Sequence, residues 1–403
     1  MPVEAAALRG PTALHARAVG PDLARGAMLL LIALANAHAY LFGRDVGVRG
    51  YPEHLERPDA AVTWLLMTAV DGWAYPFFGL LLGYGLVQLL RRLERAGEPM
   101  AGARSLLRRR GAWLMVLGLL HALLLFSGDI LGAYGLLVVL VAGSVLSGSD
   151  RRLLLLAGCC SLLVVLLAAV QGVPAPSGTA SFLPSLGTTD PAAALGYRVV
   201  EWLGVTLFGA GIVAPAVLVG AWAGRRGLLD QPEQHLRRLR TGAAVGLAVG
   251  LLGAQPLALA AAQAWQDPPV AGSVPAAVLH TVTGFAAGLG YACLGGLVAV
   301  RLASRRGPVV SALVAALVAT GQRSLTCYLA QSVVFVALLA SYGGGLGDDL
   351  GVGQVTGAAL LTWLGTVLLA VGLARVGLRG PFEVLLRRLT YGSARPAPVT
   401  QGP

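Results

Sequence analysis

Residues 108–140 read RRRGAWLMVLGLLHALLLFSGDILGAYGLLVVL and decide the fold of this chain. Three arginines end at Arg110, an apolar run containing His121 follows, and a short polar segment ending at Asp129 separates it from a second apolar run. Long apolar runs are typical of membrane-spanning helices, and arginines beside them stay on the cytoplasmic side. This stretch therefore predicts a hairpin of two membrane helices, with His121 and Asp129 toward the opposite face.

Two interpretations of His121 and Asp129 stay open. Ionisable side chains are costly in hydrocarbon, so within spans they face a protein interior or a water-filled cavity and often have a role. The structural alternative is a satisfied core histidine and an aspartate that caps the helix of residues 130–134.

The composition predicts a polytopic membrane protein. Of the 403 residues, 56% are hydrophobic and 12% are charged, and the mean hydropathy is +0.73. Soluble domains carry about a quarter charged residues. The net charge of +11 comes from short arginine clusters between apolar runs, as the positive-inside rule produces, which argues against a nucleic-acid partner. Without CxxC or Cys/His spacing, the four cysteines indicate neither a disulfide scaffold nor a metal site.

We expect an all-α bundle of about ten membrane helices. The predicted spans are at about 26–42, 64–90, 112–126, 130–147, 153–171, 199–222, 242–263, 277–300, 309–340 and 355–374. The ninth is too long for one straight helix, so we expect a break near Arg323 and the real span from Ser324. Most arginines then fall on one side, which predicts that both termini are cytoplasmic.

The expected organisation follows from these spans. Residues 1–21 form a cytoplasmic tail, and the many spans that follow argue against a cleaved signal peptide. Residues 22–224 form an N-terminal transmembrane half, 225–241 a cytoplasmic loop, 242–378 a C-terminal half, and 379–403 an interfacial helix and tail. An irregular outer loop is expected at 172–197.

Polar candidates lie at two depths. Asp22 and Arg25 are three residues apart at the cytoplasmic edge, and Asn36 shares the Arg25 helix face about 16 Å further along. His38 points elsewhere on that helix. By topology, the outer candidates are Asp71, His121, Asp129 and His280, and the inner ones are Asp22, Arg25 and Arg323. A histidine beside a carboxylate can act as a general base or as a proton relay.

A polar stripe is predicted in the ninth span, where Ser324, Tyr328 and Gln331 are spaced at i, i+4 and i+7. Such a stripe is often only an interhelical contact. The segment GPFEVLLRRLTYG at 380–392 predicts an interfacial amphipathic helix.

Several motifs resemble the YeiB family of bacterial integral membrane proteins, whose C-terminal half is a domain of unknown function, number four-one-eight. The matching motifs are DLARG at 22–26 with Asn36, GLLLGYG at 79–85, the arginines followed by His121, GDIL at 128–131 with Tyr134, LVGAWAGRRGLL at 218–229, GQRSLTCYLAQS at 321–332 and GPFEVLLRRLTYG at 380–392. The chain departs from the family where relatives often read GRMALTNY, since it has Gln322, Arg323 and Cys327. Val384 and Leu386 stand where tryptophans are common.

The family is distantly similar to transmembrane acyltransferases such as the heparan-α-glucosaminide N-acetyltransferase group, which share the DxxRG start and the following Asn. The resemblance implies acyl transfer from cytoplasmic acyl-CoA, as co-substrate rather than bound cofactor, to an acceptor at the outer face. Arg25 would hold the anionic end of the donor and Asn36 would orient the carbonyl. The base would be His121 oriented by Asp129, or else His38 or His54. Tyr134, Arg323, Tyr328 and Gln331 are further substrate-binding candidates.

Two other functions stay open. A proton-coupled transporter of a small metabolite or drug would use Asp71, His121 and Asp129 as its titrating groups. A scaffold would use the same residues only for helix packing. The expected partners are the lipid bilayer, a small-molecule or envelope acceptor and a second copy of the chain, at the plasma membrane.

Overall fold

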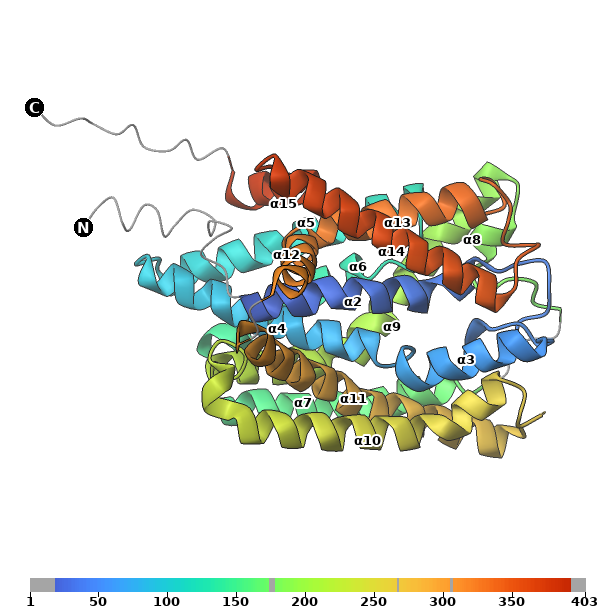
Figure 1. Cartoon of the computed structure of the whole chain (residues 1–403), viewed down its shortest axis with the longest axis horizontal. Coiled ribbons are helices and arrows are strands. Elements are labelled where there is room, and N and C mark those ends of the chain that lie inside the picture. The colour runs from blue at the N-terminus through green and yellow to red at the C-terminus, as the bar shows by residue number, and fades with distance from the viewer. Residues whose placement is uncertain (1–18, 174–177, 267, 305–306, 393–403) are drawn as a thin grey trace, which may run out of the picture.

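The computed structural model describes residues 19–173, 178–266, 268–304 and 307–392. These residues form helices and no strand, with two isolated β-bridges in the loops, which confirms the predicted all-α class (Figure 1). Most of the predicted tail at 1–21 and the chain after 392 lie outside the described residues. The long helices are α2 (Val19–Ala37), α3 (Arg57–Ala69), α4 (Ala74–Arg95), α5 (Met100–Leu124), α6 (Leu131–Ser147), α7 (Asp150–Val170), α9 (Pro191–Arg225), α10 (Leu236–Ala261), α11 (Val270–Ser304), α12 (Pro308–Gln322), α13 (Ser324–Leu339), α14 (Val352–Arg375) and α15 (Pro381–Tyr391).

Each of the ten predicted spans coincides with helical structure, but not all are long, apolar helices. Within the described residues, seven helical segments are long and apolar enough to cross a membrane, or eight if α12 and α13 form one span. The other two predicted spans are α5, which carries arginines in its first half, and α6, which is apolar but short. Both nevertheless pack along the bundle beside the longer helices (Figure 1).

The predicted break in the ninth span is confirmed. α12 and α13 meet at Arg323 with a bend of 85°. In Figure 1 α12 is seen end-on while α2 and α14 run along the picture. Gly321 allows α12 to approach the start of α2 closely, because a Cβ there would lie 1.8 Å from the carbonyl oxygen of Asp22. α12 therefore lies across the start of α2, and only α13 runs along the bundle.

The predicted irregular loop at 172–197 is partly helical, so that prediction was wrong in its extent. It contains the short helix α8 (Pro184–Gly187), and α9 begins at Pro191 instead of near 199. The cause is local: Pro191 suits a first helical position, and Asp190 accepts a hydrogen bond from the Ala192 amide at 3.0 Å. The extra turns carry Arg198 into a buried position, where its Nη1 donates to the Leu123 carbonyl at 2.6 Å.

The outer surface of the bundle is apolar, as a bilayer requires. Leu162 of α7, Leu252 of α10, and Leu361 and Leu368 of α14 are each more than 70% exposed. Two clusters of buried apolar side chains fill the interior. In water such a surface would be an aggregation site, whereas lipid covers it at no cost. The chain is therefore an integral, multi-pass membrane protein.

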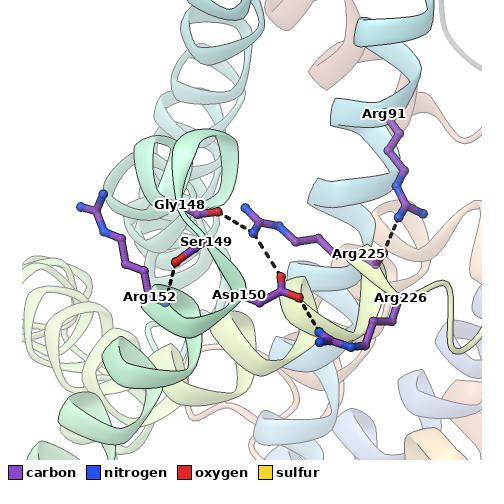
Figure 2. A network of polar contacts seen from close by, with 7 residues as sticks. All are labelled: Arg91, Gly148, Ser149, Asp150, Arg152, Arg225 and Arg226. Carbon is purple, nitrogen blue, oxygen red and sulfur yellow. Dashed lines mark hydrogen bonds and ion pairs between the residues drawn. The ribbon is translucent and has the colours of Figure 1, made fainter.

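One end of the bundle gathers the charged helix termini, and we call it the arginine-rich end; it includes residues 91–110, 150–152 and 225–240. Figure 2 shows its best-defined network. Asp150 at the start of α7 accepts from Arg225 at 3.3 Å and from Arg226 at 2.7 Å. Arg91 of α4 donates to the Arg225 carbonyl at 2.5 Å. These contacts tie the ends of α4, α7 and α9 together.

Candidate functional site

A cavity of about 200 Å³ lies at the end of the bundle opposite the arginine-rich end, and we call it the chamber. Its walls come from the end of α2, the α3–α4 and α5–α6 turns, the middle of α9, and the loops. Most of the lining is apolar. The residues with polar side chains that line it are Asn36, His38, Arg49, Asp71, Tyr75, Asp129, Gln171 and Thr281.

His38 is the lining residue best arranged to take a proton. Its Nε2 lies 3.2 Å from the carbonyl oxygen of Arg49, which can only accept, so Nε2 carries the hydrogen. In the neutral ring Nδ1 is then a lone-pair acceptor, and this buried nitrogen has no hydrogen-bond partner in the described structure. The ring stacks on Tyr51 with 4.1 Å between centroids, which fixes its orientation.

Asp71 is held beside His38 by two residues of the outer loop. The Tyr51 hydroxyl donates to Asp71 Oδ2 at 3.2 Å, and Arg49 Nη2 lies 3.9 Å from Oδ1. Burial, with the nearby Asp71 charge, raises the pKa of Tyr51 well above its usual value, so the hydroxyl keeps its proton and donates. Tyr51 thus joins the imidazole and the carboxylate through one side chain.

The turn that presents Asp71 depends on Gly72. Its φ of +73° is one that side-chain-bearing residues rarely adopt, and a Cβ there would lie 2.6 Å from the ring of His280. His280 Nε2 donates to the Met67 carbonyl at 3.0 Å and so braces the end of α3. The structure therefore gives His280 a supporting position behind the chamber.

Asn36 and Tyr75 form a second polar pair on the lining. The Tyr75 hydroxyl lies 3.4 Å from Asn36 Oδ1, to which it donates. The pair joins the end of α2 to the start of α4. An amide and a phenol in an apolar wall can orient a ligand carbonyl.

Asp129 reaches the chamber with His121 behind it. Asp129 Oδ1 lies 2.8 Å from His121 Nδ1, and Oδ2 accepts from the Gly132 amide at 2.8 Å. The Tyr328 hydroxyl donates to Oδ1 at 3.4 Å. His121 does not line the chamber, although its buried Nε2 has no partner among the described residues. Asp129 both caps α6 and pairs with a histidine, so it has the features of both interpretations drawn from the sequence.

The other predicted residues do not line the chamber. Arg25 Nη1 pairs with Asp22 Oδ1 at 3.1 Å near the start of α2. Arg323 is buried and donates from Nε to the Leu378 carbonyl at 3.1 Å and from Nη1 to the Ala319 carbonyl at 3.2 Å. These backbone contacts brace the α12–α13 break. Gln331 donates to the Leu29 carbonyl at 3.4 Å, midway along α2. Tyr134 stacks on Phe78, and His54 is exposed in the outer loop.

The sequence prediction did not include Arg49, Tyr51 or Tyr75. One signal was present for Arg49: it is an arginine in an outer loop, against the positive-inside pattern, and glycines lie close on either side of it. The backbone of Arg49 has a φ of 60°, which such a tight turn requires. Tyr51 and Tyr75 carried no comparable signal, because tyrosines near membrane ends are common.

The arrangement suits acid–base chemistry on a small or chain-like ligand. The described residues include no group of three or more His, Cys, Asp or Glu side chains that could hold a metal ion. The chamber instead offers an imidazole with a lone pair, two carboxylates, a guanidinium and an amide within apolar walls.

Fold and chamber together define a multi-pass helical membrane protein with a buried polar site at one end of the bundle. Residues 223–393 match a family described as "Protein of unknown function (DUF418)". This match supports the resemblance to a YeiB-like family over that part of the chain. No curated protein matches the chain. Of the polar chamber residues, only Thr281 falls within the matched segment.

Proposed function

We propose that this chain is a plasma-membrane acyltransferase that takes an acyl group from acyl-CoA on the cytoplasmic side and transfers it to an acceptor bound in the chamber. The observation that carries the proposal is the unpartnered Nδ1 of His38, a residue of the chamber wall. A general base needs a free lone pair within reach of the acceptor proton, in a site that excludes water.

In the proposed reaction, His38 Nδ1 takes the proton from an acceptor hydroxyl or amine. The acceptor atom forms a bond to the acyl carbonyl carbon, and the bond from that carbon to the CoA sulfur breaks. The imidazolium then returns the proton to the departing thiolate. The carboxylate of Asp71 stabilises the positive charge on the ring meanwhile, and Asn36, held by Tyr75, orients the carbonyl.

Arg25 has a supporting role in this proposal. It lies on α2 with its side chain 18% exposed, paired with Asp22, on the same helix as Asn36 and one helical segment before His38. A guanidinium there would attract the phosphates of the donor. α2 would then carry the donor-binding cation and the carbonyl-orienting amide, and the short 3-10 helix that follows it, His38–Tyr40, would carry the base.

His38 replaces His121 as the favoured base. His121 is behind Asp129 and does not line the chamber, whereas His38 does. The role proposed for the His121–Asp129 pair is to shape the chamber wall.

The test is transfer of radiolabel from acyl-CoA to cell-envelope material by membranes that contain the protein. His38→Asn should lower transfer by a factor of at least 100, because general-base catalysis contributes about 10²–10⁴-fold. His54→Asn is the matched control, an exposed histidine of the loop that also carries Arg49 and Tyr51, and should leave transfer unchanged. Wild-type transfer in His38→Asn with loss in His121→Ala would assign the base to His121 instead.

A transporter is the second candidate, and the broken helix pair favours it. Discontinuous helices with polar residues at the break are typical of secondary transporters. Here the 85° bend lies at Arg323. Substrate flux that requires a proton gradient, without any labelled covalent product, would favour transport over acyl transfer.

A further inference from the structure

A second candidate site lies at the arginine-rich end, on α5. Its walls are one face of that helix, with Val139 of α6 opposite. We call it the α5 groove, and the described residues that line it are Ala101, Arg104, Ser105, Arg108, Arg109, Ala112 and Val139. Three guanidinium groups therefore share one depression that includes no carboxylate among these residues.

The guanidinium groups of the groove do not take part in the contacts that hold the described helices together. Among the described residues, none accepts a hydrogen bond or forms an ion pair with Arg108 or Arg109, and the buried Nε of Arg104 has no partner. Arg225 and Arg226 at the same end differ, because Asp150 and a backbone carbonyl hold them (Figure 2). Like charges gathered without a counter-charge repel one another, so an anion would stabilise the groove.

The groove continues into an exposed apolar stripe. Val116, Leu120 and Leu124 follow Ala112 at intervals of four residues and are 42%, 47% and 69% exposed. Because α5 runs from the arginine-rich end toward the other end of the bundle, charge is followed by apolar surface along one helix face. The pattern matches a molecule with an anionic head and a hydrocarbon chain.

Close helix packing fixes the shape of the groove. A Cβ on Gly111 would lie 2.7 Å from the Gly135 carbonyl oxygen and 2.8 Å from Val139 Cγ2. The two helices therefore meet at the level where the arginines end and the apolar stripe begins. α15 borders the site, since a Cβ on Gly392 would lie 3.7 Å from Arg109 Nη2.

We propose that the α5 groove binds the phosphate of an anionic phospholipid of the cytoplasmic leaflet, with an acyl chain along Val116, Leu120 and Leu124. Arginine pairs with phosphate through two parallel hydrogen bonds, and basic pockets between membrane helices bind anionic headgroups. The apolar stripe favours a lipid over a soluble phosphate.

Native mass spectrometry of the full-length protein in detergent tests this site. Phosphatidylglycerol should bind at least tenfold more tightly than phosphatidylcholine of the same chain length. The variant R104Q/R108Q/R109Q should lose that preference. The variant R237Q/R238Q/R240Q removes the same charge at the same end, from exposed arginines of α10 that do not line the α5 groove, and should keep it.

Three results would overturn the proposal. Equal loss of binding in both triple variants would mean that only net charge matters. Equal binding of dihexanoyl and long-chain phosphatidylglycerol would remove the apolar stripe from the site. Displacement of lipid by millimolar inorganic phosphate or CoA would make the ligand a soluble phosphate. The melting temperature of each variant shows whether it is folded. The variant V116S/L120S leaves the arginines intact and should weaken the binding of long-chain lipid only.

Discussion

At the scale of single residues, Asp129 is the carboxylate of the chamber that accepts the most hydrogen bonds. It accepts hydrogen bonds from His121, from the Gly132 amide and from Tyr328, and it is fully buried. Asp129→Ala leaves these donors unpaired, and removing one partner of a buried network costs about 2–4 kcal/mol. We expect a clear drop in the midpoint of thermal unfolding in detergent.

The matched variants separate the hydrogen bonds from the charge. Asp129→Asn keeps one oxygen acceptor and should lose less stability than Asp129→Ala. Asp45→Ala, at an exposed position of the outer loop, should change the free energy of unfolding by less than about 0.5 kcal/mol. If Asp129→Ala unfolds at the wild-type temperature, the pairing with His121 is not structural.

At the scale of elements, the α12–α13 break is stabilised from outside by α15. Glu383 accepts from the Leu325 amide at 2.7 Å and from the Thr326 amide at 3.1 Å, the first free N–H groups of α13. It also accepts from the Thr326 hydroxyl at 2.5 Å. A carboxylate at a helix N-terminus is favoured by the free amides and by the helix dipole.

Glu383→Ala should therefore free both α15 and the first turn of α13. We expect faster hydrogen exchange in residues 324–328 and 381–391, at a cost of about 2 kcal/mol in local stability. Exchange in α10 should not change. Glu233→Ala, an exposed glutamate of the loop before α10, serves as the control. Unchanged exchange at both segments in Glu383→Ala would show that α15 is held by its apolar face alone.

Elements were easier to predict than their ends. Apolar length predicted a helix for every span, and Gly321 to Ser324 predicted the break, because composition and polar interruptions are visible in the sequence. The start of α9 was missed because the Pro, Ser, Gly and Thr content of residues 172–197 predicted an irregular loop, although Asp190 and Pro191 are a local helix-start signal. The docking of Glu383 on α13 joins residues 57 positions apart and has no local pattern.

At the scale of the whole molecule, the chamber is also formed by contacts between residues distant in the sequence, which have no local pattern. Of the four residues predicted at the outer face, Asp71 and Asp129 line the cavity, whereas His121 and His280 lie behind it. Asn36 and His38, which the sequence analysis did not include in that outer group, line the same cavity. Which histidine lines the cavity depends on side-chain direction, which the sequence did not fix. Whether these groups act as a site stays a prediction.

The orientation of the whole bundle is still a prediction from the arginine pattern, and labelling with a membrane-impermeant maleimide can test it. Glu53 lies exposed in the loop before α3, and Gln234 lies exposed before α10. In intact cells Glu53→Cys should react and Gln234→Cys should react only after the membrane is opened, because the arginine-rich end stays in the cytoplasm. The wild-type chain, whose four cysteines lie in membrane helices, gives the background signal. The reverse pattern would place the chamber on the cytoplasmic side, where acyl-CoA and acceptor would meet without any transfer across the bilayer, and would move the α5 groove to the outer leaflet.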